Sequence, residues 1–254
     1  MNRFIGFSTL VRREIVRFTS VFKQTIFPPV ISSFLYIAIF GFTLGREINE
    51  VNGMPYLNFL IPGLVMMYLI EGSYSNTSSS LFISRWAGHI QEILVTPLSY
   101  VEMVLAILIG GLARSFVVSS GVFLVSLLFT WTPLTHPFVV IFMVVFVSLS
   151  FSAAGAIVAL FAEEFEHLSV LSTFVITPLI FFGGVFHSTA MLHPVLQTIT
   201  RFNPMFYMVN GMRYGMLGTS DVGMTQCFAV VSVFFAVLFA FTVYLFKTGF
   251  KLRK

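Results

Sequence analysis

The chain has 254 residues, of which 57% are hydrophobic and only 9% are charged. Soluble domains carry about 25% charged residues, so this composition excludes a soluble enzyme and predicts an all-α integral membrane protein. The formal net charge of +4 is therefore attributed to membrane-anchoring residues rather than to nucleic-acid binding.

The first 23 residues predict an amphipathic helix that lies in the cytoplasmic membrane interface. Its apolar residues recur at intervals of three or four, at Phe4, Phe7, Val11, Ile15, Phe18 and Phe22. Arg13 and Arg17 lie on the opposite face, where we expect them to meet anionic headgroups. The alternative is that the apolar stripe packs on neighbouring spans. Pro28 and Pro29 then mark the bend into the first span.

Six apolar segments are predicted to cross a bilayer core of about 30 Å, which needs roughly 20 helical residues. They cover about 25–45, 57–82, 103–130, 138–161, 168–186 and 224–246. Residues 1–254 are thus interpreted as a single transmembrane domain with the interfacial helix at 1–23.

The Lys and Arg residues predict that both termini are cytoplasmic. Ten of the 14 fall on the side of the termini and three, Arg46, Arg201 and Arg213, fall on the other. Acidic residues have little weight in this rule.

Motifs of enzymatic sites are missing from the sequence. It has no G-x-x-x-x-G-K-[ST] phosphate loop, G-x-G-x-x-G, H-E-x-x-H or G-x-S-x-G. The polar run from Glu163 to His167 contains suitable metal ligands, but a solvated turn before the fifth span is the favoured interpretation. We therefore expect no catalytic residue, no metal and no cofactor in this chain.

Three ionisable residues, Glu71, Glu102 and Arg114, form a candidate intramembrane polar site. A charge at the bilayer centre costs about 2.5–3.5 kcal/mol on insertion scales, so such residues face a partner or a cavity. Glu102 and Arg114 are twelve residues apart on one helix, about 18 Å, and cannot pair. Glu71 is fourteen residues from Arg85, about 21 Å, and Arg114 has a similar depth. Glu71 and Arg114 are predicted to pair or to line one cavity; a purely structural tether is the alternative.

The loop after the second span predicts a short amphipathic helix from Trp86 to Val95, stopped before Pro97. Ile90, Ile93 and Leu94 form its apolar face, and a helix of this kind suits a partner's groove.

The segment 183–222 predicts a re-entrant helical hairpin before the last span. Gly183 and Gly184 end the fifth span, and a first short helix is expected from Met191 to Thr200. Asn203 caps a second helix that begins at Pro204, carries Arg213 and runs to Leu217. A helical cap on the outer surface is the alternative.

The order of these features resembles the ABC-2 type transporter permeases. The resemblance rests on G-H-I-Q-E-I-L-V-T-P-L-S after the second span and F-F-G-G-V-F…N-P-M-F-Y-M-V-N-G-M-R-Y-G-M-L-G before the last. It covers nearly the whole chain and is closest to the YadH-like branch with the exporters of Nod factors and polysaccharides.

The resemblance implies a permease homodimer in a bacterial inner membrane, joined to two copies of a separate ATPase subunit that binds ATP and Mg. Docking would use the N-terminal helix and the coupling helix after the second span. Its residues are Gly88, His89, Ile90, Gln91, Glu92, Ile93, Leu94, Thr96 and Pro97. Family substrates are exported and are often amphipathic or lipid-linked.

Two other functions fit the residues. A proton-coupled secondary transporter would use Glu71 and Arg114, but the inverted repeats of such transporters are not visible. A non-transporting scaffold would use the small-residue spacings Gly41-x-x-x-Gly45 and Gly211-x-x-x-Gly215 for helix packing.

Overall fold

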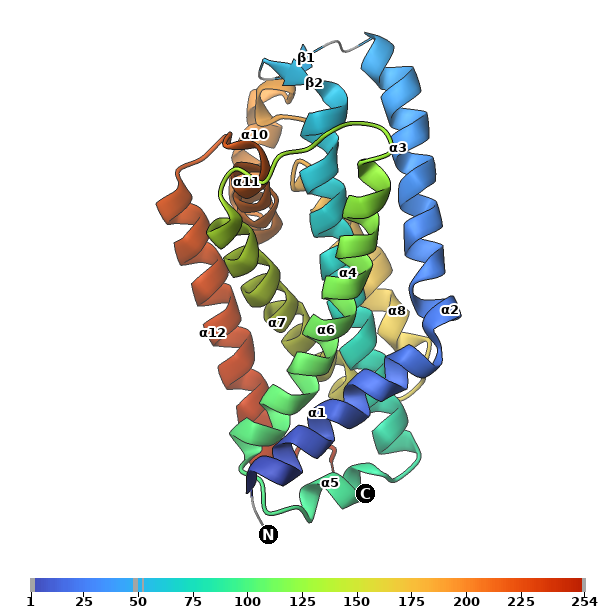
Figure 1. Cartoon of the computed structure of the whole chain (residues 1–254). Helices are drawn as coiled ribbons and strands as arrows, with labels where there is room; N and C mark the ends of the chain where they lie inside the picture. The colour runs from blue at the N-terminus through green and yellow to red at the C-terminus, as the bar shows by residue number, and fades with distance from the viewer. Residues whose placement is uncertain (1–2, 48–49, 52, 253–254) are drawn as a thin grey trace.

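A computed structural model describes residues 3–47, 50–51 and 53–252. Arg253 and Lys254, two of the cations used for the orientation, lie outside the described residues, and so does the side chain of Arg46. The described chain folds into a bundle of long helices with short elements at both ends (Figure 1).

Five helical segments are long and apolar enough to cross a membrane. They are Phe22–Thr43, within α2 (Phe22–Thr25) and α3 (Phe27–Glu47), then α4 (Tyr56–Trp86), α6 (Tyr100–Ser126), α7 (Pro137–Phe161) and α12 (Met224–Thr248). Each coincides with a predicted span. The sequence-based expectation of a helical membrane protein is consistent with this architecture.

The predicted span at 168–186 forms a shorter apolar helix, His167–Phe182. It comprises α8 (His167–Leu171), the π-helical η1 (Ser172–Ile176) and α9 (Thr177–Phe182). At 1.5 Å per residue this segment is about 24 Å long, which is less than a bilayer core of about 30 Å. The predicted count of six spans is therefore not confirmed.

The α4 helix lies at the centre of the bundle, and α6 and α7 pack directly against it (Figure 1). Glycines permit this close packing: a Cβ on Gly155 of α7 would lie 2.5 Å from the Tyr74 carbonyl oxygen of α4. Similarly, a Cβ on Gly111 of α6 would lie 2.1 Å from the Ser152 hydroxyl. Small residues at helix contacts are typical of membrane bundles, where van der Waals packing replaces the hydrophobic effect.

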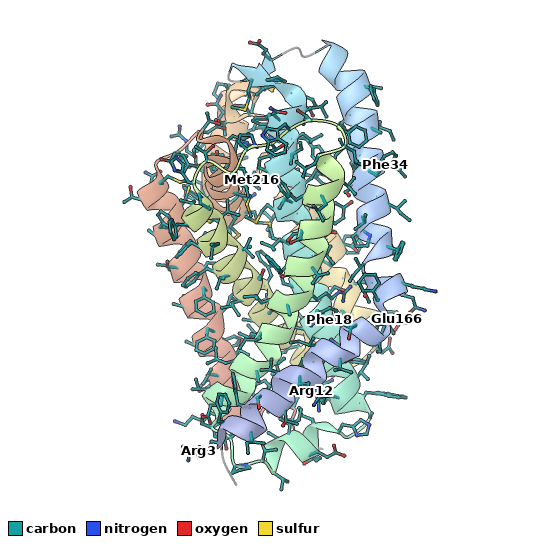
Figure 2. The ribbon with its side chains drawn as sticks, in the orientation of Figure 1. Arg3, Arg12, Phe18, Phe34, Glu166 and Met216 are labelled. Atoms are coloured by element: carbon teal, nitrogen blue, oxygen red, sulfur yellow. The ribbon has the colours of Figure 1, made fainter. Side chains whose placement is uncertain are left out.

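Apolar side chains cover the outward faces of the edge helices α3 and α12. Phe34 of α3, labelled in Figure 2, is partly exposed and packs on Phe129, with ring centroids 5.2 Å apart. Val233 and Val237 of α12 are also exposed. Such faces suit surrounding lipid rather than water.

The two ends of the bundle carry different short elements (Figure 1). At one end α1 (Arg3–Ser20) crosses the bundle near α5 (Ile90–Leu94), and both chain termini lie there. At the other end are the antiparallel β1 (Glu50–Val51) and β2 (Met54–Pro55). The helices of 183–222 lie towards this second end.

The segment 183–222 contains η2 (Thr189–Met191), α10 (Pro194–Arg201) and α11 (Pro204–Leu217). The predicted bounds of the second helix are confirmed: Asn203 accepts a hydrogen bond from the Met205 amide, and Gly218 ends the helix with φ of +77°. The first helix begins later than predicted, at Pro194, because a 3₁₀ turn precedes it. Its re-entrant placement in the membrane stays a prediction.

Candidate functional site

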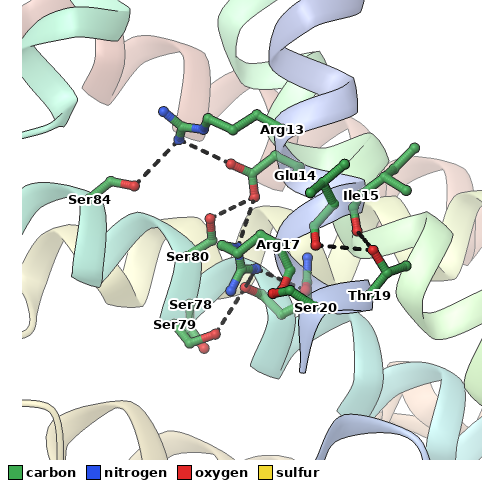
Figure 3. A network of polar contacts seen from close by, with 12 residues as sticks. Arg13, Glu14, Ile15, Arg17, Thr19, Ser20, Ser78, Ser79, Ser80 and Ser84 are labelled. Atoms are coloured by element: carbon green, nitrogen blue, oxygen red, sulfur yellow. Dashed lines mark hydrogen bonds and ion pairs between the residues drawn. The ribbon is translucent and has the colours of Figure 1, made fainter. Parts of the chain in front are cut away.

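Three charged side chains of α1 contact α4 or one another, and one of them is buried. Glu14 is fully buried, between Leu10 and Phe18 on the inward face of α1. The Ser80 hydroxyl donates a 2.6 Å hydrogen bond to Glu14 Oε2, and Arg13 Nη2 lies 3.1 Å from Glu14 Oε1 (Figure 3). A buried carboxylate needs such partners because its desolvation is costly.

Arg17 extends this network one turn further along α1. Its Nε lies 3.5 Å from Glu14 Oε2, and its Nη2 donates to both the backbone oxygen and Oδ1 of Asn76, each at 2.9 Å. Arg13 Nη2 also lies 3.4 Å from the Ser84 hydroxyl. Burial lowers the pKa of Arg17, and the Glu14 carboxylate opposes this shift. Three residues of α1 thus hold the C-terminal third of α4, from Asn76 to Ser84.

The surroundings predicted for the two arginines of α1 are corrected, whereas the interfacial placement of the helix stays a prediction. Arg13 and Arg17 turn toward α4 rather than toward headgroups, and Phe18 of the apolar stripe packs into the bundle. Phe4 remains 75% exposed. The spacing of the apolar residues revealed the stripe. It does not reveal that Glu14 binds Ser80, which lies 66 positions further along the chain.

The α1 helix also packs closely on α6. A Cβ on Gly110 would lie 2.5 Å from Glu14 Cβ, so only glycine leaves room for the buried carboxylate. A Cβ on Gly6 would lie 3.4 Å from Leu98, in ordinary contact with the loop after α5. The network and the close approach fix α1 against both α4 and α6.

The predicted coupling helix is present but shorter than expected. Gly88, with φ of +80°, separates it from α4, and Thr96 ends it by donating a 2.7 Å hydrogen bond to the Ile93 carbonyl. Pro97 follows in a bend. The helix therefore covers only Ile90–Leu94, whereas the sequence predicted residues 86–95.

The apolar face of α5 packs inward, contrary to the expectation that it enters a partner's groove. Ile90 and Ile93 are buried in the chain's own core, so they are not free to enter a partner's groove. The outward surface carries Glu92 and His89, whose Oε1 and Nδ1 are 3.5 Å apart, and Val95, which is 84% exposed.

A groove of about 320 Å³ runs between α1 and α5. Its walls come only from these two helices and the loop after α5, and they consist of Ile5, Gly6, Thr9, Leu10, Arg13, Glu92, Ile93, Thr96 and Leu98. The structure thus brings together the two segments that the sequence singled out for docking.

Glu71 and Arg114 line one cavity of about 380 Å³. Its other walls come from α2, the start of α3, η1 and α9. The four ion pairs among the described residues do not include one between these two side chains. Arg114 Nε and the Tyr68 hydroxyl are buried and make no hydrogen bond of ordinary geometry.

Glu102 lies apart from this cavity, in the first turn of α6. Its Oε2 accepts a hydrogen bond from the Ser99 amide at 2.7 Å, and the Glu102 amide donates one to Ser99 Oγ at 3.3 Å; these two bonds form a capping box. Its inclusion in the candidate polar site is corrected accordingly. Helix capping explains this carboxylate, because the first helical amides have no partner within the helix.

The residues predicted for the re-entrant segment converge around the end of α9. Asn203 Nδ2 donates to the Leu179 carbonyl at 2.6 Å, and Arg213 Nη2 donates to the Gly184 carbonyl at 2.7 Å. A Cβ on Gly183 would lie 3.3 Å from the Met205 carbonyl carbon, next to Pro204. These contacts join the start and middle of α11 to the turn after α9.

Arg213 is the largest fully buried side chain of the described bundle. Its Cζ lies 3.9 Å from the centroid of the Phe59 ring, and its Nε and Nη1 have no hydrogen-bond partner among the described atoms. On α4, Gly63 makes room for this region, since a Cβ there would lie 2.8 Å from the Val185 carbonyl oxygen. Stacking on an aromatic ring compensates part of the cost of burying a guanidinium.

The sequence did not predict the contacts that join α1 to Ser80 and Asn76 through Glu14 and its neighbour Arg17. One signal was available: Glu14 is the only acidic residue among the first 23, and α4 is rich in serine from Ser73 to Ser84. Among the residues that the structure describes, no group of three or more His, Cys, Asp or Glu side chains is placed to hold a metal ion.

Comparison with known proteins identifies the family. The profile of the ABC-2 type transporter family matches residues 6–217. The chain belongs to the ABC-2 type transporter family. It is 36% identical to the inner membrane transport permease YadH of Escherichia coli K12 over 249 residues, 98% of this chain and 97% of YadH.

More distant members are also similar along most of the chain. Nodulation protein J of Rhizobium meliloti is 25% identical over 230 residues, 88% of each chain. Nodulation protein J of Neorhizobium galegae is 25% identical over 212 residues, 82% of this chain and 79% of that protein. The resemblance inferred from the motifs is thus confirmed at the level of the family.

Proposed function

We propose that this chain is the permease subunit of an inner membrane exporter driven by a separate ATPase subunit, which docks on α1 and α5 from the cytoplasm. The observation that carries this proposal is the groove between those two helices. The chain has no phosphate-binding motif of its own, so ATP and Mg would be bound by the partner.

The contacts of α1 supply a route from the docking groove into the bundle. Arg13 lines the groove and also contacts Glu14 and Ser84, so it belongs to both the docking surface and the buried network. A displacement of α1 by the partner would be transmitted to α4 through Glu14 and Ser80. Charged groups held in one arrangement resist sliding because separation leaves a buried charge without a partner.

The proposed assembly contains two permeases and two ATPases. Its cargo would be an amphipathic or lipid-linked molecule moved outward between protomers. The exposed apolar residues Phe34, Ile39 and Phe174 on α3 and η1 would suit a second protomer or the apolar part of such a cargo. With both termini and α5 at one end of the bundle, that end would be cytoplasmic.

A proton-coupled secondary transporter is the second candidate, because Glu71 and Arg114 line one cavity. This mechanism would need no nucleotide-binding partner. Substrate flux in vesicles that depends on a proton gradient and not on ATP would favour it over the proposed exporter.

The first test is purification of the tagged permease from native membranes in mild detergent, with identification of any co-purifying ATPase subunit. The docking variant is Glu92→Arg with Val95→Asp, which alters only the exposed side of α5. Ile93→Asp is unsuitable because Ile93 is buried and its loss would unfold the region.

The matched control is Glu164→Arg with Phe165→Asp, exposed residues in the turn before α8. We expect an ATPase to accompany the wild-type and control proteins and to be lost from the docking variant, with unchanged thermal unfolding. Absence of a nucleotide-binding chain from every sample would overturn the ATP-driven mechanism.

A further inference from the structure

We propose that the cavity lined by Glu71 and Arg114 binds the zwitterionic phosphate-ester headgroup of a membrane amphiphile. Arg114 would contact the phosphate and Glu71 the ammonium group. The inference deepens the proposed function, on which it rests for the amphipathic nature of the cargo, by naming the headgroup chemistry.

One acidic and one basic side chain in the cavity favour a ligand that has both a positive and a negative group. Both residues lie on membrane-spanning helices, yet neither belongs to an ion pair found among the described residues. Arg114 Nε is buried without a hydrogen-bond partner, which leaves a guanidinium donor for an anion. A planar guanidinium suits phosphate oxygens, whereas a purely anionic ligand would be repelled by Glu71.

The hydroxyl groups of the wall fit the remaining polar atoms of such a headgroup. Tyr68 presents a buried hydroxyl without an ordinary hydrogen bond, and Ser75 and Thr173 also line the cavity. Thr173 lies in the π-helical η1, a geometry that occurs frequently at functional sites. The volume of about 380 Å³ is near the lower end of small-molecule sites, roughly 300–1,000 Å³. It accommodates a headgroup rather than a whole lipid.

The position of α1 places the cavity near the level of lipid headgroups. Asn76 contacts Arg17 of α1, and Glu71 is five residues away on α4, about 7.5 Å at 1.5 Å per residue. An interfacial helix lies about 5–10 Å into the headgroup and acyl boundary. If α1 lies at the headgroup level, the depth of Glu71 is counted from Asn76 rather than from Arg85, because α1 covers α4 from Asn76 to Ser84.

Apolar surfaces beside the cavity would hold the acyl chains of the amphiphile. Phe27 and Ile31 of α3 are 52% and 56% exposed, and Phe174 of η1 is 74% exposed. Thr25 and Pro29, which line the cavity, lie within two residues of Phe27 or Ile31 in the chain. The headgroup would therefore enter laterally while the chains stay in the membrane.

The test is native mass spectrometry of the purified full-length permease, titrated separately with phosphatidylethanolamine and phosphatidylglycerol. The variants are Arg114→Gln and Glu71→Gln, and the matched controls are the exposed Arg201→Gln and Glu164→Gln. Thr173→Trp fills the cavity from an exposed position without changing any charge.

We expect Arg114→Gln to weaken binding of both lipids by about tenfold or more, the loss of one charge-assisted contact. Glu71→Gln is expected to weaken only phosphatidylethanolamine, and Thr173→Trp to weaken both without altering thermal unfolding. Unchanged affinities in all three variants, or equal binding of the two lipids by the wild type, would overturn the proposal.

The lipid-binding test and the test of the proposed function can fail independently of each other. Co-purification of an ATPase with Arg114→Gln, whose substitution is remote from α5, reports on the exporter assembly independently of lipid selectivity. Lipid selectivity in a preparation that contains no ATPase would support the headgroup site and count against the ATP-driven mechanism.

Discussion

The Ser80 hydroxyl donates a 2.6 Å hydrogen bond to Glu14 Oε2, which joins α1 to the central helix of the bundle. The two residues are 66 positions apart in the chain. This contact, with the two arginines beside it, makes α1 a fixed part of the bundle.

Replacing Glu14 with alanine is expected to release α1. The substitution leaves Arg13 and Arg17 without their carboxylate; because both arginines are partly exposed, we expect a cost of about 1.5–3 kcal/mol, the value of a hydrogen bond to a charged group. We expect a lower melting temperature in detergent and faster tryptic cleavage at these arginines. Glu164→Ala, at an exposed position, is the control; a Glu14→Ala protein that melts and is cleaved like that control would contradict the role of the network.

Gly110→Ala tests the same contact from α6. The added methyl group would lie 2.5 Å from Glu14 Cβ, so α1 must shift or Glu14 must change rotamer. Overpacking of this kind costs about 1–3 kcal/mol. Gly223→Ala is the matched control, since its nearest neighbour is Thr225 Oγ1 at 4.0 Å. Equal melting temperatures for the two alanine variants would show that α1 is not held as described.

Arg213→Lys should loosen the contact between α11 and the turn after α9. Lysine cannot reproduce both the stacking on Phe59 and the bond to the Gly184 carbonyl, and we expect a loss of about 2 kcal/mol. Differential scanning fluorimetry measures this as a lower melting temperature. The same replacement at the exposed Arg201 should leave the melting temperature unchanged.

The half-buried His187, whose Nε2 atom is buried, predicts a dependence of stability on pH. Burial lowers its pKa below the ordinary value of 6.5, the Arg213 charge adds to this shift, and Asp221 opposes it. The folded protein therefore binds the proton more weakly than the unfolded chain. Stability is complete above about pH 6.5 and falls as the pH drops from there to the lower folded-state pKa.

We expect His187→Gln to remove part of the decrease in melting temperature between about pH 7.5 and about pH 5.5. His193→Gln is the control, because His193 is exposed. A wild-type protein whose stability rises on acidification over this range would be inconsistent with a neutral, half-buried imidazole.

The sequence alone determined the membrane-bundle character of the chain, because 57% hydrophobic residues cannot be covered by a polar surface. It also predicted α11 correctly, since an Asn203 cap, a proline in the first turn and Gly218 act locally. The motif-based resemblance selected the right family for the same reason: its signals are short and contiguous in the chain.

Only the tertiary structure decided which helix faces are buried. The apolar spacing of α1 and α5 was visible, but burial of Glu14 and Ile93 depends on partners from other helices. The structure likewise assigned Glu102 to a capping box and placed Glu71 and Arg114 in one cavity without an ion pair. Depth and orientation in a bundle follow from how helices cross, and a periodic pattern along one helix does not contain that information.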